Sequence, residues 1–120
     1  MGKMSRDKGK RGERELASIL REFGYKARRG QQYCGVNGDG DVVGLPGLHI
    51  ECKRVESLRL YDAFAQSAAD ARAGEIPVVV HRRNHCPWVV IVGLEDFATI
   101  YREWEAGKGG GEDGKAICER

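Results

Sequence analysis

Residues 38–54 read GDGDVVGLPGLHIECKR, and this stretch decides the fold. Two short apolar runs flank Pro46-Gly47, a pattern typical of two buried strands joined as a hairpin. The second run ends in a carboxylate and an amine, Glu51 and Lys53, two positions apart. Because side chains alternate along a strand, these two share one face while their neighbours turn to the core.

Asp41 precedes the first apolar run and is expected to lie across the hairpin from Glu51. Two converging carboxylates repel each other unless a cation lies between them. Oxygen ligands suit Mg²⁺ or Mn²⁺, and such an ion can activate water against a phosphoryl group. Lys53 would orient or deprotonate that water, or balance the charge of the transition state. The alternative is that Glu51 and Lys53 are ordinary exposed strand residues that form a cross-strand ion pair.

The metal hypothesis requires a particular pairing register in the hairpin. A plain two-residue turn would set Asp41 opposite Cys52, which places the carboxylate on the wrong face of the sheet. A metal site therefore requires a bulge, a bend or a longer turn within residues 39–48. Gly40 and Gly44 are the candidate positions for it.

A helix is predicted from Lys10 to Phe23, with an apolar stripe formed by Leu16, Ile19, Leu20 and Phe23. Glu13 continues this stripe toward the N-terminus, whereas Glu15 is expected to face water. An inward carboxylate needs a partner, so Glu13 is a candidate third acid of the same site. Alternatively, the helix dipole alone stabilises it.

Further elements follow from the apolar patterns. We predict a strand over 25–29, strands over 41–45 and 48–53, a helix over 60–73, strands over 76–81 and 88–92, and a helix over 94–106. The apolar sides of the last two helices are predicted to comprise Leu60, Phe64, Ala68 and Ala71, then Phe97, Ile100, Tyr101 and Trp104. The order α-β-β-β-α-β-β-α predicts an α/β domain with a mixed central sheet flanked by helices.

Length and composition favour one soluble domain. The chain has 120 residues, of which 41% are hydrophobic, and its apolar runs are too short to span a bilayer. With no signal peptide visible, we expect a cytoplasmic protein that does not contact membranes. We divide it into a flexible basic arm (1–9), a single domain (10–106) and a disordered tail (107–120).

Charge is distributed unevenly along the chain. Residues 1–30 hold ten lysines and arginines against four acidic residues, although the net charge of the whole chain is only +2. A basic end on a nearly neutral protein indicates a polyanionic partner, most simply nucleic acid. The alternative is a basic tail that is merely solvated.

Taken together, RGERELASILREFGYKARRG, GDGDVV, HIECKR and IPVVVHRR resemble the archaeal-type Holliday junction resolvases, small members of the PD-(D/E)xK nuclease superfamily. The resemblance covers about residues 8–92. It implies a restriction-endonuclease-like core and a homodimer that cuts paired strands of four-way DNA junctions by Mg²⁺-dependent (or Mn²⁺-dependent) hydrolysis. It also implies a catalytic set whose three acids bind the metal: Glu13, Asp41, Glu51 and Lys53. One departure is Gly40, where the family often has a proline before the strand acid.

Contacts to DNA are expected from basic side chains. The resemblance implies that Arg14 and Arg29 approach the phosphate backbone. The N-terminal arm offers Arg6, Lys8, Lys10 and Arg11, and a loop offers Arg82 and Arg83, unless that loop is simply a solvated turn. Many relatives also have a glutamine on the next helix. Gln66 is its candidate, but the helical wheel places it opposite the apolar side, where it would be solvated.

Three further features have competing interpretations. The apolar side of the last helix is either a dimer surface or, more commonly, a cover for the protein's own sheet. His49 shares a face with Glu51, and we expect it at the rim of the site. The sequence HRRNHC (81–86) offers zinc-ligand types but fits no common zinc pattern.

Other functions remain open at this level. The same residues would serve a PD-(D/E)xK nuclease that acts on nicked, flapped, single-stranded or restriction-type DNA. A DNA-binding module without catalysis, or a structural domain whose basic arm is incidental, are the remaining alternatives.

Overall fold

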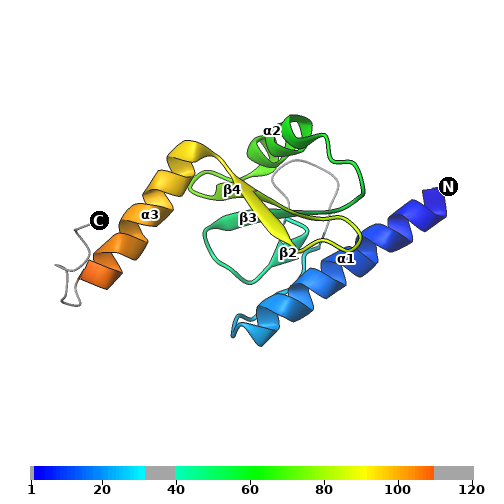
Figure 1. Ribbon diagram of the computed structural model, residues 1–120, viewed down its shortest axis with the longest axis horizontal. Helices are drawn as coiled ribbons and strands as arrows, with labels where there is room; N and C mark the ends of the chain where they lie inside the picture. Colours follow the sequence, from blue (N-terminus) through cyan, green and yellow to red (C-terminus); the bar gives the residue numbers. More distant parts are fainter. Residues whose placement is uncertain (1, 32–39, 110–120) are drawn as a thin grey trace.

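The structure is a computed structural model that describes residues 2–31 and 40–109 (Figure 1). Its elements are α1 (Gly2–Glu22), β1 (Arg28–Arg29), β2 (Val42–Val43), β3 (Leu48–Arg54), α2 (Leu60–Asp70), β4 (Ile76–Arg82), β5 (Val89–Val92) and α3 (Leu94–Gly109). Their order confirms the predicted α-β-β-β-α-β-β-α pattern. None of the helices in the described part of the chain combines the length and apolarity that crossing a bilayer requires.

The five strands form one mixed sheet in the order β1-β2-β3-β4-β5. β3 and β4 run parallel and are joined by α2, whereas the other neighbours are antiparallel. The predicted crossover and mixed sheet are therefore confirmed. Figure 1 shows α1 and α2 on opposite sides of the sheet.

Alternation along β3 and β4 assigns a different role to each face of the sheet. On the α1 side, Leu16 and Ala17 pack on a buried cluster that includes Ala27, Val42, Ile50, Cys52, Val78 and Val80. On the α2 side lie the odd-numbered residues of β3, together with fully buried Val79 and Ser67. This second face holds polar side chains that are buried, and it is where the functional residues of β3 lie.

The hairpin turn forms where it was predicted. The backbone N–H of Leu48 donates to the carbonyl of Leu45 (3.1 Å), and Gly47 has a φ of +95°. Proline followed by a glycine with positive φ is the preferred sequence of a type II turn.

The strand before the turn has one residue more than the strand after it. Counting from the paired Val42 and Ile50 toward the turn, the extra residue falls at Gly44, whose φ is +120°. The sequence predicted a bulge of this kind, and the register confirms it. Asp41 comes directly before the pair of Val42 and Ile50: its backbone N–H donates to the Ile50 carbonyl (2.7 Å), and its carboxylate is near enough to Glu51 for its charge to act on that residue.

The ends of the chain differ from the prediction. α1 begins at Gly2, whereas the sequence predicted a flexible arm over 1–9 and a helix only from Lys10. The extra turns contain no proline and are rich in lysine and arginine, which favour helix. At the other end α3 continues to Gly109, and the rest of the predicted tail lies outside the described residues.

The side chains of two helices are also turned differently. On α2, Ala63 and Ser67 are the buried residues, while Leu60 is 41% exposed, so the predicted apolar side was wrong. The Ser67 hydroxyl donates to the Val78 carbonyl (3.3 Å), which allows a polar residue to face the sheet. The apolar side of α3 does not cover the protein's own sheet, as we had favoured, but stays exposed.

Substituting Gly44 should damage the bulge. A Cβ there would collide with the carbonyl oxygen of Lys26, in addition to the strain of a positive φ. We expect Gly44→Ala to lower the free energy of unfolding by at least about 2 kcal/mol, measured by urea denaturation. Gly47→Ala is the matched control, because Gly47 has a positive φ but open space around it. It should cost only about 1 kcal/mol; equal losses would show that the close approach is unimportant.

Candidate active site

A backbone N–H from β3 fixes the carboxylate of Asp41. The N–H of Cys52 donates to Asp41 Oδ2 (2.8 Å), and the N–H of Asp41 itself donates to the Ile50 carbonyl (2.7 Å). A Cβ at Gly40 would lie only 2.6 Å from the Ile50 carbonyl oxygen, so a glycine there lets the chain approach β3 closely. These contacts hold Asp41 against the strand that supplies Glu51 and Lys53.

Glu51 is buried on the α2 face, with a side chain that is 11% exposed. Burial, followed by the nearby negative charge of Asp41, raises its pKa from 4.5 to about 7. A hydrogen bond from His49 and the positive charges of His49 and Lys53 act in the opposite direction but do not cancel these effects. Burial and the neighbouring carboxylate therefore both disfavour the ionised form of Glu51, which a bound cation would favour.

Glu13 approaches the site from α1, across the other face of β3. Its Oε1 accepts a hydrogen bond from Arg29 Nε (2.9 Å), and its side chain is 16% exposed. Burial nevertheless raises the pKa of Glu13, and the charge of Asp41 adds to this effect. The predicted inward orientation of Glu13 is correct. Asp41 acts on both Glu13 and Glu51, and none of the three acids points into bulk solvent.

Lys53, half-buried on β3, lines a surface depression between that strand and α1. Lys8 and Gly9 of α1 line the same depression. Its neighbour Cys52 has a thiol pKa raised to about 12, chiefly by burial, so that thiol stays protonated and serves the core. Lys53 and Lys8 both bring a positive charge to this depression, and Lys8 also lies 3.8 Å from Glu56.

One group of side chains is close enough to hold a metal ion. Ligand atoms of His49, Glu51 and Asp70 lie within 4.8 Å of one another. The acids predicted from the sequence do not form so close a group, and Glu51 alone belongs to both sets. Carboxylate oxygens suit Mg²⁺ or Mn²⁺, whereas an imidazole nitrogen suits softer ions such as Zn²⁺ or Fe²⁺. A cation beside Glu51 would offset the effect of burial on its carboxylate.

Two members of this group, His49 and Asp70, were not predicted from the sequence as site residues. His49 was expected at the rim, but it is only 2% exposed and forms a hydrogen bond with Glu51 (2.9 Å). Asp70 ends α2, where the helix dipole disfavours a carboxylate, and that position was an available signal. Gln66 is exposed on α2, one turn before Asp70.

The histidine and cysteine side chains of residues 81–86 do not come close enough together to form a zinc site. The His81 ring lies 2.9 Å from the Val55 carbonyl, and the group named above is the one metal-binding cluster in the described part of the chain. His85 adopts a positive φ of 64° in the turn between β4 and β5. These residues shape the turn.

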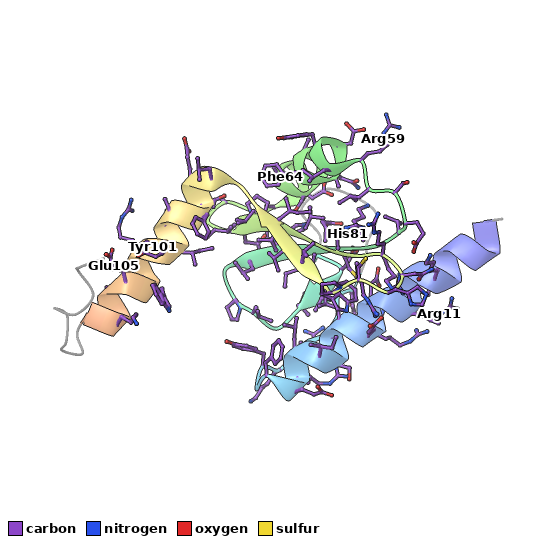
Figure 2. All side chains as sticks on the ribbon, viewed as in Figure 1. Arg11, Arg59, Phe64, His81, Tyr101 and Glu105 are labelled. Carbon is purple, nitrogen blue, oxygen red and sulfur yellow. The ribbon has the colours of Figure 1, made fainter. Side chains whose placement is uncertain are left out.

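A basic groove lies on the α1 side of the sheet, between α1 and the end of β3, and its lining includes both sequence neighbours of Glu13. Its lining residues are Lys8, Arg11, Gly12, Arg14, Glu15, Arg54 and Asn84. A Cβ at Gly12 would lie 2.6 Å from the Arg54 Cβ, so a glycine is needed where α1 crosses β3. Figure 2 shows Arg11 on the half of α1 that projects past the sheet. The side chain of Arg6 lies outside the described residues.

Glu15 faces the protein, contrary to our expectation. It accepts hydrogen bonds from Arg82 (2.5 Å) and from the Trp88 indole (3.3 Å), and so ties α1 to β4 and β5. Arg82 is engaged in this contact, whereas Arg83 is exposed and bonds only to the nearby Cys86 sulfur (3.3 Å).

Acids on a mixed sheet crossed by one helix, beside a basic groove, define a nuclease of the restriction-endonuclease-like class. A family model for the archaeal Holliday junction resolvase (Hjc) matches residues 4–99. The chain is also similar to the solved structure of Hjc, a Holliday junction resolvase from Archaeoglobus fulgidus. That likeness has a TM-score of 0.54 and 29% identity, and covers 71% of this chain and 72% of the other. No curated protein matches significantly. The chain belongs to the archaeal Holliday junction resolvase family.

Removing the charge of Glu51 should stabilise the metal-free protein in a pH-dependent way. Its pKa is about 7 in the fold against 4.5 as the ordinary value, so the folded state binds this proton more tightly. The free energy of unfolding therefore falls as pH rises from 4.5 through 7. In EDTA, we expect Glu51→Gln to raise the melting temperature by about 5 °C or more at pH 8, and to change it little at pH 5. Glu22→Gln, at an exposed position of α1, is the control. An increase of equal size at both pH values would contradict the raised pKa.

Proposed function

We propose that this junction-resolving nuclease is a Mg²⁺-dependent homodimer that introduces paired cuts into four-way DNA junctions. Membership of the resolvase family supports nuclease action on branched DNA. The observation that supports the metal-dependent step is the proximity of Asp41 to the other two acids: its carboxylate is bound by the Cys52 N–H of β3, and its charge raises the pKa of both Glu51 and Glu13. Glu13 and Lys53 complete the proposed catalytic set.

Asp41 and Glu51 would hold the ion, and Glu13 would approach it from the α1 side, where the charge of Asp41 acts on it; Mn²⁺ is the alternative metal. A bound divalent ion would polarise a phosphoryl oxygen and lower the pKa of the attacking water. The chain's own residues prepare this arrangement: the Cys52 N–H orients Asp41, and Arg29 orients Glu13. Lys53, on the same face of β3 as Glu51, would donate to the scissile phosphate and offset the charge that develops there.

The DNA backbone would follow the basic groove on α1. Lys8, Arg11 and Arg14 line it, and its one acid, Glu15, is already neutralised by Arg82. Lys10 is exposed on the same helix, and Arg29 lies at the site, partly occupied by Glu13. Such contacts position the backbone without reading bases, so the substrate would be chosen by its shape. Arg83 extends this surface, and Gln66 stands near Asp70 as a further candidate.

Two cuts in a two-fold substrate need two identical sites. A four-way junction presents two equivalent strands, and a two-fold dimer places two copies of one site at a fixed separation. The proposal therefore includes one site in each subunit.

Cleavage of a synthetic four-way junction tests the proposal. With Mg²⁺ we expect symmetric paired nicks, and no comparable cutting of linear duplex of the same sequence. Asp41→Ala and Glu51→Ala should each reduce the rate at least about a hundredfold, because a lost ligand costs more than the 10–100-fold typical of outer-shell partners. Both variants should still bind the junction, measured by gel shift.

The control is Glu22→Ala, which removes an exposed carboxylate from α1 and should cleave normally. Junction cleavage that persists in both Asp41→Ala and Glu51→Ala would refute the proposed site. Equal cutting of junction, flap and duplex DNA would refute the proposed substrate.

A further inference from the structure

α3 presents an apolar surface that the described part of its own chain leaves uncovered. The rings of Phe97 and Tyr101 lie 6.5 Å apart, those of Tyr101 and Trp104 5.4 Å apart, and each side chain is about half exposed. Ile100 lies on the same side and is 41% exposed. Figure 2 shows Tyr101 and Glu105 well away from the sheet. A row of this kind on a soluble protein marks an interaction surface.

The position of α3 makes this exposure informative. The helix leaves the far end of β5 and extends away from the sheet, without substantial packing on any other element (Figure 1). A single helix of 16 residues is marginal in water when no tertiary contact supports it. α3 therefore needs a surface to pack on.

A matching groove lies at the opposite end of β5. It has a volume of about 510 Å³ and runs between the start of α2 and the outermost strand, with apolar lining from Leu58, Leu60, Pro87, Val89 and Ile91. β5 is the edge of the sheet, and α2 does not cover it. The groove begins near Val89, whereas α3 departs after Val92, so the helix leads away from the groove of its own chain.

We propose that α3 of a second copy of this chain fills the groove, and that the exchange is reciprocal. Each copy offers one helix and one groove, and a two-fold axis satisfies both with a closed assembly. Charge is complementary: α3 has four acids and two bases, while the groove rim carries exposed Arg83, together with His81 and the Arg82 that is paired with Glu15, against Glu56. This inference rests on the proposed function only for the reason why a dimer is needed, namely two active sites. The contacts between helix and groove are argued from the structure alone.

In a reciprocal exchange each copy contributes two contact areas, its helix and its groove. An aromatic side chain buries ~150–250 Å² when covered, so the three half-exposed rings of the helix offer about 300 Å². A standard interface needs about 800 Å² per partner, so the rest must come from other side chains of the helix and from the groove. Leu94, Ile100, Val89 and Leu60 enlarge the apolar surface on both sides of the exchange. The proposed interface lies at the β5 edge, two strands away from β3 and three from β2, so Asp41 and Glu51 stay uncovered, whereas Arg83 would lie at the interface and not on the DNA surface.

Sedimentation of the full chain without DNA tests the exchange. We expect the mass of two chains for the wild type. Trp104→Glu, which alters the helix, and Val89→Glu, which alters the groove, should each raise the dissociation constant by about a hundredfold or more. Thr99→Glu is the matched control, because it adds the same charge to the opposite side of α3. Far-UV circular dichroism checks that each variant is folded.

Mixing the two variants distinguishes the exchange from other pairings. One intact helix then meets one intact groove, so a mixed dimer should form at concentrations where either variant alone is monomeric. A monomeric wild type would overturn the proposal, including the case in which the helix folds back on its own groove. A fully dimeric Val89→Glu would also overturn it, since that result indicates helix-to-helix packing. Neither result bears on cleavage, which is measured separately.

A second, independent observation concerns His49, which lies between two carboxylates under the site. Its Nε2 is 2.9 Å from Glu51 Oε2, and its Nδ1 is 3.6 Å from Glu75 Oε1. Glu75 is itself held by the Arg72 backbone N–H (2.8 Å). When Glu51 is ionised, as a metal ligand must be, it can only accept, so the His49 ring donates from Nε2 and occupies one oxygen of Glu51.

We infer that His49 is a positioning residue that fixes Glu51 so that its other oxygen is presented to the metal, with Glu75 orienting the imidazole. His49 is fully enclosed and does not need to contact the substrate for this role. Outer-shell partners of this kind typically change metal affinity 10–100-fold when removed.

Calorimetric titration with Mn²⁺ tests this role apart from cleavage. We expect His49→Leu to weaken Mn²⁺ binding about tenfold or more, and His49→Gln, whose amide can donate from the Nε2 position, to recover most of it. A purely structural histidine would leave the affinity of folded variants unchanged. If His49→Gln binds as poorly as His49→Leu, or if neither variant loses affinity, the positioning role is refuted.

Discussion

A shift of one residue in the hairpin register is the constraint on which the site depends. The extra residue at Gly44 shifts the hairpin register by one, and the N–H of Cys52 holds the Asp41 carboxylate against β3. From that position the charge of Asp41 acts on both Glu51 and Glu13. A plain two-residue hairpin would instead pair Asp41 with Cys52. The backbone at one glycine thus contributes to the electrostatics of the site.

Much of this arrangement was readable from local patterns. Alternation in HIECKR, the Pro-Gly turn and the inward position of Glu13 predicted the faces correctly, because strand and helix periodicity act over a few residues. The expected bulge also followed from counting residues outward from Pro46-Gly47, because a plain two-residue turn would pair Asp41 with Cys52 and separate it from Glu51. The order of helices and strands followed from the same short-range signals.

What could not be predicted depends on contacts between distant segments. Glu15 was expected in water because its partner, Arg82, is far away in sequence. His49 was assigned to the rim because nothing local shows that α2 and Glu75 close over it. The face of α2 was misjudged for the same reason: Ser67 can be buried only because the Val78 carbonyl is there to accept its hydroxyl. The periodicity of polar and apolar residues predicts which side of an element is buried, but it does not show which distant residue will pair with a polar side chain on that side.

The two strands that carry the first half of the site are very short. β1 and β2 have two residues each, whereas β3 and β4 have seven and pair along their full length. Few backbone hydrogen bonds protect the β1–β2 edge, so it opens at a lower free energy than the rest of the sheet. Glu51 and Lys53 therefore lie on the part of the sheet that resists opening, whereas Asp41 lies beside the less protected edge. If the enzyme selects DNA by its shape, as proposed, this edge would adjust to a distorted branch point without unfolding of the domain.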